Sequence, residues 1–417
     1  MSISILQHTQ GIQGYQLDRS EFKEGLYIAH ISKKPNKQQC VDCKSFNVTA
    51  TFINERIIKV LPMGMKATRF SIRMHRLACH DCPAYRMEGI QFTSTSTSRV
   101  SKYLERLVVD LRQHMSIKAV AEHYDLHWET VKNIEKKYLN KKHKVIRLKD
   151  VEAIGIDEVY MGKKFGRKYD EKNDIKDKMN GYLTIVRDLR SGAVLFVGKG
   201  KKGSCLDKFA VKVKRSKAII KYIAVDLAAS FTSWIQSNFS DATIVYDHFH
   251  VIKLVNDRLS KIRRRIMNEL ETEEKSELKG KRWHFNINNE NLTESAKEEL
   301  NTCCYLYEEL GKAYVLKEAL RRIYSIRDVV FAQNALVYWC ERAENSEIPE
   351  MVSMAKTIRK HGAGIIAFWE TGITSASMEG FNNKIGWLTR QAYGYRDVEY
   401  LILKIYDLPN LKVTKEL

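Results

Sequence analysis

Four of the eight cysteines form two Cys-x-x-Cys pairs, which are typical of metal sites in a cytosolic chain. The pairs are Cys40 with Cys43 and Cys79 with Cys82. Four thiolates in tetrahedral geometry predict a closed, structural zinc site with no open position for a substrate. The separation between the pairs is longer than the usual template, so two redox dithiols or chance remain as alternatives.

Three acidic residues in the rest of the chain are candidates for a second kind of site. Asp157 and Asp226 each end a predicted apolar strand, and Glu379 lies on a predicted helix among small and amide residues. Carboxylates that converge at one point bind Mg²⁺, and two divalent cations can hold the attacking and leaving oxygens of a DNA phosphoryl transfer. Spacing alone does not select this triad, because many aspartates end strands or cap helices.

Asp247 and its neighbours allow two interpretations. Asp247 ends the strand after that of Asp226 and is followed by His248 and His250. It is either a fourth carboxylate of the metal site, with His250 contacting phosphate, or the N-cap of the next helix, which we favour. Glu158 should point to the opposite side of the strand from Asp157 and is interpreted as structural.

The helix around Glu379 has two distinct faces. At 100° per residue, an apolar stripe is separated from a face that carries Glu379, Asn383, Gly386 and Arg390. Gly386 would leave room for a metal site or a DNA backbone. The periodicity is equally compatible with a solvated face.

Residues 101–140 show the pattern of a helix-turn-helix. Ser116 can cap a helix over Ile117–His123, a turn follows, and a second helix is predicted over Trp128–Lys137. A plain helical hairpin is the alternative. The candidates for contact with a DNA groove are His127, Glu129, Thr130, Lys132 and Asn133.

The elements that must position the carboxylates form a mixed α/β pattern. Three strands joined as a meander are followed by helix, strand, helix and strand, up to Asp247. Residues 249–370 are predicted to be helical. Within them, Arg263, Arg264 and Arg265 are candidate phosphate contacts, although a solvated helix face is the more usual explanation.

The charge balance favours a polyanionic partner. Seventy Lys and Arg against fifty Asp and Glu give a net charge of +20, whereas solubility needs only about 2 to 8 charges on a small domain. Nucleic acid is favoured over an anionic membrane surface. No secretory signal or apolar stretch long enough to span a bilayer is recognisable, so a cytoplasmic location is expected.

Several long stretches resemble the DDE transposases of the bacterial ISL-three insertion-sequence family. They are "CVDC…CHDC", "IGIDEVYMGKK", "AVDLAASF", "IVYDHFHVIKLVNDRL" and "ETGITSASMEGFNNKIGWLTRQAYGYRDVEYL", and the resemblance covers roughly residues 20–407. It implies a ribonuclease-H-like core interrupted by helices, after a zinc-binding motif and a helix-turn-helix. The catalytic triad would be Asp157, Asp226 and Glu379, holding Mg²⁺ or Mn²⁺. Leu227 and Ala228 depart from the bulkier family pattern without moving the aspartate.

The resemblance implies a transposase that cuts and joins DNA at the terminal inverted repeats of an insertion sequence, without a covalent protein–DNA intermediate. The partners would be double-stranded DNA and, since two ends are joined, at least a second copy of the chain, with binding at the nucleoid. The alternatives are a DNA-binding regulator with a silent core, and a serine or tyrosine recombinase. The predicted domains are 1–95 (zinc-binding), 96–145 (helix-turn-helix), 146–255 (first part of the core), 256–370 (helical insertion) and 371–417 (last part of the core).

Overall fold

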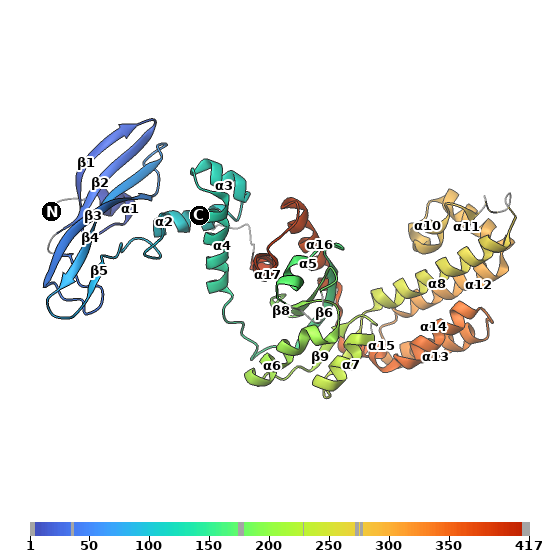
Figure 1. Ribbon diagram of the computed structural model, residues 1–417. Coiled ribbons are helices and arrows are strands. Elements are labelled where there is room, and N and C mark those ends of the chain that lie inside the picture. Colours follow the sequence, from blue (N-terminus) through green and yellow to red (C-terminus); the bar gives the residue numbers. More distant parts are fainter. Residues whose placement is uncertain are drawn as a thin grey trace. The chain divides into compact units, whose positions relative to one another are not determined.

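The computed structural model describes residues 5–34, 37–173, 179–227, 229–271, 275 and 278–410 (Figure 1). The chain forms two compact units, Met1–Lys144 and Val145–Leu417. No helix in the described ranges is long and apolar enough to cross a membrane.

The first unit is built around a five-stranded sheet. Its strands are β1 (Tyr15–Lys23), β2 (Leu26–Lys33), β3 (Val48–Lys59), β4 (Thr68–Cys79) and β5 (Tyr85–Met87), and α1 (Ile5–Gln10) precedes them. The order is β1-β2-β4-β3, with β5 on β4. In the sequence, Phe70, Ile72 and Met74 alternate with Ser71, Arg73 and His75, which predicts a strand with one apolar face. This is confirmed, since Phe70, Ile72 and Met74 of β4 are buried on one face.

Three helices complete this unit and include the predicted helix-turn-helix pair. They are α2 (Lys102–Leu111), α3 (Ile117–His123) and α4 (Trp128–Lys142). The Ser116 hydroxyl caps α3 as expected, by accepting a hydrogen bond from the Ala119 N–H at 3.1 Å. The second helix is longer than predicted and runs to Lys142, because Leu139 on it is still buried.

The second unit contains a mixed sheet of order β10-β9-β6-β7-β8. Its strands are β6 (Ala153–Tyr160), β7 (Tyr182–Asp188), β8 (Val194–Lys199), β9 (Tyr222–Val225) and β10 (Thr243–Tyr246). The strands β6, β7 and β8 form the predicted antiparallel meander, and β9 and β10 run parallel to β6. The mixed α/β class is therefore confirmed.

Helices cover both faces of this sheet. On one face, Ile154 and Ile156 pack with α6 (Asp207–Ser216) and α7 (Ala229–Asn238). On the other face, Val159 and Ile185 pack with α16 (Ala376–Gln391) and α17 (Val398–Asp407). Two short elements, α5 (Arg167–Lys172) and η2 (Gly203–Leu206), precede β7 and α6.

The described residues between β10 and α16 form helices and turns, without a strand. The helices are α8 (His248–Glu269), α10 (Arg282–Asn286), η3 (Asn289–Asn291), α11 (Glu294–Leu306), α12 (Glu308–Ile323), α13 (Val329–Glu344), α14 (Pro349–Lys360) and α15 (Gly362–Thr371). In Figure 1 the long helices α8, α12, α13 and α14 lie side by side, and they pack on one another. Near the C-terminus, α17 is followed by η4 (Leu408–Asn410).

Candidate active site and metal centre

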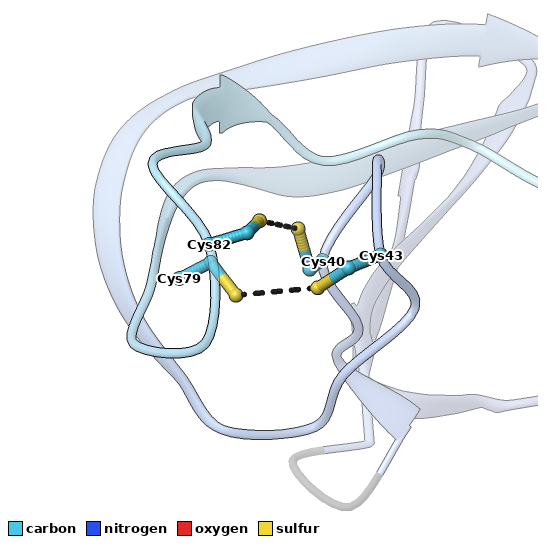
Figure 2. A group of neighbouring side chains, drawn as sticks. All are labelled: Cys40, Cys43, Cys79 and Cys82. Carbon is cyan, nitrogen blue, oxygen red and sulfur yellow. Dashed lines mark hydrogen bonds between the residues drawn. The ribbon is translucent and has the colours of Figure 1, made fainter.

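The two cysteine pairs come together at one end of the sheet of the first unit. Cys79 ends β4, Cys82 lies in the turn before β5, and the other pair lies in the turn before β3. Figure 2 shows the four thiols facing one another. The Sγ atoms of Cys40 and Cys82 are 3.6 Å apart, and those of Cys43 and Cys79 are 3.5 Å apart.

These distances fit a tetrahedral metal site. Zinc–sulfur bonds of about 2.3 Å place the sulfurs of a regular tetrahedron about 3.8 Å apart. All four ligand atoms lie within 4.8 Å of one another, and none of the thiols is in a disulfide. The N–H of Cys43 donates to Cys40 and lowers the pKa of that thiol to about 7, whereas hydrogen bonds with neighbouring sulfurs raise the pKa of Cys43 and of Cys82. The donor set therefore suits zinc.

Hydrogen bonds outside the thiols hold the two turns together. The Asn47 side-chain amide donates to the Asp81 carboxylate at 2.9 Å, and the Ser45 hydroxyl donates to the same carboxylate. The Asp81 N–H in turn approaches the Cys79 sulfur at 3.4 Å. The two turns are thus connected by side chains as well as by the thiols.

In the second unit, Asp157 lies on β6, and Asp226 directly follows the neighbouring parallel strand β9. The register pairs Gly155 with Ala224, so its continuation places Asp157 beside Asp226. Asp157 was expected to end its strand, and this was wrong: β6 continues to Tyr160, because it stays paired with β7 as far as Tyr182. Burial raises the pKa of the Asp157 carboxyl, and the charge of Asp226 raises it further.

Helix α16 brings a third group to Asp157. The side-chain amide of Asn382 donates to Asp157 Oδ2 at 2.7 Å. Gly155 permits this approach, because a Cβ there would lie 2.9 Å from Met378 of α16. Sequence reasoning chose Asn383 instead, yet Asn383 is exposed. A spacing of three residues from Glu379 was the pattern that could have identified Asn382.

Glu379 lies in the first turn of α16, one turn before Asn382, with an exposed side chain. The start of this helix is fixed from the sheet, since Arg187 of β7 donates to the Ser377 carbonyl at 2.7 Å. In the described part of the chain, only the four cysteines bring three or more ligand atoms within 4.8 Å of one another. The three predicted carboxylates share one region of the fold without converging that closely.

Glu158, which was interpreted as structural, is close enough to Asp157 and Asp226 to be affected by their charges. Its position in the alternation of β6 puts it on the sheet face of Ile154 and Ile156, opposite Asp157 as expected. Burial and the charges of Asp226 and Asp157 nevertheless raise the pKa of Glu158 to about 7. The sheet edge thus concentrates negative charge, as a cation site requires.

The raised pKa of Glu158 predicts a pH-dependent stability. The folded chain keeps this proton up to about pH 7, whereas the unfolded chain releases it near 4.5. The stabilisation is therefore present below pH 4.5 and is lost as the pH rises to 7. In urea denaturation without divalent cations, the midpoint of wild type should fall as the pH rises from 5 to 8. The midpoint of Glu158→Gln should fall less steeply over the same range. The exposed Glu370→Gln variant should keep the wild-type slope, and an unchanged slope in Glu158→Gln would contradict the assignment.

Asp247 caps a helix, which is the favoured of its two interpretations. It is 2% exposed, and its Oδ1 accepts a hydrogen bond from the Phe249 N–H of α8 at 3.0 Å. Its other oxygen accepts from the Ser375 hydroxyl, 128 residues away and directly before α16. Burial alone would raise the pKa of Asp247, but hydrogen bonds from His248, Ser375 and Phe249 hold it below its usual value. Asp247 therefore connects α8 with the helix that carries Glu379.

Replacing Asp247 by alanine should destabilise the second unit by about 2–4 kcal/mol. The change removes an N-cap worth about 1 kcal/mol and leaves the buried Ser375 hydroxyl without its acceptor, at about 1–3 kcal/mol. Asp328 caps α13 in the same way but is exposed. The Asp328→Ala variant should therefore lose only about 1 kcal/mol in the same urea titration. Equal losses would show that the link to Ser375 adds nothing.

The other predicted contacts with DNA differ in exposure. His127 is the N-cap of α4, where its Nδ1 accepts from the Glu129 N–H. In the remaining set, exposed side chains are those of Glu129, Asn133, Arg264 and Arg390, and half-buried ones are those of Thr130, Lys132, Arg263 and His250. Trp128 was not among the candidates for contact with DNA, although its ring is exposed and Lys132 Nζ lies 5.6 Å from the ring centroid.

The arginine run of α8 is largely engaged inside the protein. Arg265 pairs with Glu309 of α12 and with Glu350 of α14, the latter at 3.0 Å. Arg263 donates to the Leu278 carbonyl at 2.7 Å. Arg264 is thus the most accessible of the three for a phosphate.

Family models match both units of the chain. A model described as a transposase, the DDE transposase of the ISL3 family, matches residues 154–405. A second one, described as the helix-turn-helix domain of transposase family ISL3, matches residues 97–139.

Individual relatives are transposases as well. The transposase for insertion sequence element IS1001 of Bordetella parapertussis is 27% identical over 412 residues, covering 96% of this chain and 97% of that protein. The transposase for IS1557 of Mycobacterium tuberculosis is 28% identical over 310 residues, covering 68% and 66%. Among solved structures, the Drosophila P element transposase strand transfer complex matches with a TM-score of 0.37 and 10% identity, over 75% of this chain and 92% of that one.

Proposed function

The chain belongs to the ISL3 family of DNA transposases, and on that premise we propose that it cuts and joins DNA at the ends of an insertion sequence with Asp157, Asp226 and Glu379. The observation that carries the proposal is the pairing of Gly155 with Ala224, two residues before Asp157 and Asp226 on the same two strands, with α16 attached to Asp157 through Asn382. Two Mg²⁺ or Mn²⁺ ions bound there would act as Lewis acids on the scissile phosphate and lower the pKa of the attacking water. The all-oxygen donor set fits such hard cations.

The chain's own groups have separate tasks in this proposal. Asn382 holds the Asp157 carboxylate in one orientation by its 2.7 Å hydrogen bond. The link from Asp247 to Ser375 and the contact of Arg187 with Ser377 fix the first turn of α16, which carries Glu379. His250, whose charge lowers the pKa of Asp157, would contact the phosphate.

The remaining assignments follow from the same proposal. The sheet of the second unit is the ribonuclease-H-like core, and its insertion is the helical region predicted over 256–370, which begins within α8 and ends within α15. The helix-turn-helix residues recognise the terminal inverted repeats, with Zn²⁺ as a structural ion in the cysteine cluster. Joining two ends requires a homodimer or a larger assembly at the bacterial nucleoid.

The test is strand cleavage of a duplex that spans the border of the element. The substrate carries the inverted repeat found beside the gene, together with flanking DNA. We expect a cut at the border in Mg²⁺ or Mn²⁺, strand transfer of the new 3′ end, and no reaction in EDTA. Specific binding of the repeat without cutting in either metal would favour a regulator over an active transposase.

A further inference from the structure

Two tyrosine rings and a lysine form an exposed cluster where β6 and β7 pair at the end of β6. Tyr160 and Tyr182 are register partners, and their ring centroids are 5.0 Å apart. Lys201 Nζ lies 4.9 Å from the centroid of Tyr182. The Tyr160 side chain is 57% exposed, so its ring is not part of the hydrophobic core. We refer to Tyr160, Tyr182 and Lys201 as the tyrosine platform.

Tight turns hold the platform in place. The N–H of Gly200 donates to the Tyr182 carbonyl at 3.1 Å, and the Thr184 hydroxyl donates to the Gly200 carbonyl at 2.7 Å. Gly181 has φ +83°, and a Cβ there would lie 2.5 Å from the Gly162 carbonyl oxygen. The turns after β6 and β8 are therefore hydrogen-bonded to, or packed closely on, the strand ends that carry the two tyrosines.

The platform lies on the strand that carries Asp157, three residues further along β6 and on the opposite sheet face. In the alternation of β6, Tyr160 shares a sheet face with Glu158, two residues before it. The positive charge of Lys201 acts on Glu158, and Glu158 in turn feels the charges of Asp157 and Asp226. Asp157 and Tyr160 are three residues apart on β6, a separation of about 10 Å, so an unpaired strand that leaves the carboxylates along β6 can reach the platform.

The charge around the platform is that of a surface for a polyanion. The segment 161–167 after β6 and the segment 198–203 after β8 contain basic side chains and no acidic ones. The exposed cations among them are Lys163, Lys164, Arg167, Lys201 and Lys202. Exposed aromatic rings among such cations suit single-stranded nucleic acid, because bases stack on the rings while the cations contact phosphates.

We propose that the tyrosine platform binds unpaired nucleotides next to the cut position, with a base stacked on Tyr160 and the backbone held by Lys201. This inference rests on the proposed function, because it names the part of the protein that holds the DNA strand leaving the catalytic carboxylates. Within a duplex the bases are paired and stacked on one another, so only the outer face of the terminal pair is open, whereas an unpaired nucleotide can bring a whole base onto Tyr160. The platform therefore favours DNA ends with a single-stranded overhang over blunt ends.

The test compares two DNA probes on the full-length chain in Ca²⁺, where binding is measured without turnover. One is a blunt duplex with the inverted repeat at its end, and the other adds a four-nucleotide overhang containing 2-aminopurine. We expect wild type to prefer the overhang and to quench 2-aminopurine by stacking. Tyr160→Ala should weaken overhang binding by about 10-fold or more and abolish the quenching, while Tyr160→Phe should retain both.

The control is Tyr305→Ala, which removes a ring that is 88% exposed on α11 and should change neither probe. Blunt-duplex affinity should stay at the wild-type level in every variant, which also reports intact folding. Unchanged overhang binding in Tyr160→Ala, or an equal loss on both probes, would overturn the proposal. Cutting by wild type is measured separately in Mg²⁺, so an overhang preference without cutting would count against the proposed function and leave the platform standing.

Discussion

Strand cleavage by the Asp157→Asn variant is expected to be at least about a thousandfold slower than by wild type, with DNA binding unchanged. The substitution removes one negative charge from the pair formed with Asp226 and so weakens the binding of a divalent cation. Losing metal-ion stabilisation of a phosphoryl transition state costs several kcal/mol, and each 1.36 kcal/mol is tenfold in rate. The measurement is a single-turnover rate constant on the border duplex in saturating Mg²⁺.

The fold should tolerate this change. An asparagine at this position keeps one oxygen for the Glu158 N–H that Asp157 Oδ1 now accepts, and the Asn382 amide can turn its own oxygen toward the new N–H in place of the present hydrogen bond. The substitution also removes a carboxyl group whose pKa is already raised by burial. The Asp241→Asn variant, at an exposed turn before β10, is the matched control and should cut like wild type. Because ligands of one metal site act as a unit, Asp157→Asn combined with Asp226→Asn should be no slower than the slower single variant. Cutting by Asp157→Asn at the wild-type rate would exclude this residue from the site.

Local patterns in the sequence were sufficient for the elements that depend on neighbouring residues. Ser116 and the spacing after it predicted α3 with the bounds that the structure has. The alternation of Phe70, Ile72 and Met74 predicted the buried face of β4. In each case the determining interactions, a cap or a strand period, lie within a few residues.

Interactions between distant segments could not be read in the same way. The continuation of β6 past Asp157 depends on its pairing with β7, and polar residues such as Glu158 gave no local indication of it. The hydrogen bond from Ser375 to Asp247 joins residues 128 positions apart, so only the cap of α8 was visible from the sequence. To choose between Asn382 and Asn383, one must know which side of α16 faces the sheet. This orientation depends on the close approach of α16 at Gly155.

Replacing Cys79 by serine is expected to abolish zinc binding and to disorder the end of the sheet that carries the cysteines. A serine hydroxyl does not supply a thiolate, and the three remaining sulfurs no longer close a tetrahedron. Binding of structural zinc contributes about 10–16 kcal/mol in zinc-finger peptides. The strands here also have a core of their own around Phe70 and Ile72, so the loss should be confined to the turns before β3 and β5 and to the ends of the strands they join.

Two measurements distinguish this outcome from a general loss of folding. Zinc content of the purified chain should fall from one ion to none in Cys79→Ser, and it should remain one in Cys304→Ser, a half-buried thiol of the second unit. Hydrogen exchange should become faster around residues 40–48 and 79–87 and stay unchanged in α13, which belongs to the second unit. Full zinc content in Cys79→Ser would exclude this thiol as a ligand. Because a protonated thiol does not bind the ion, zinc release from wild type on acidification should be accompanied by the same local increase in exchange.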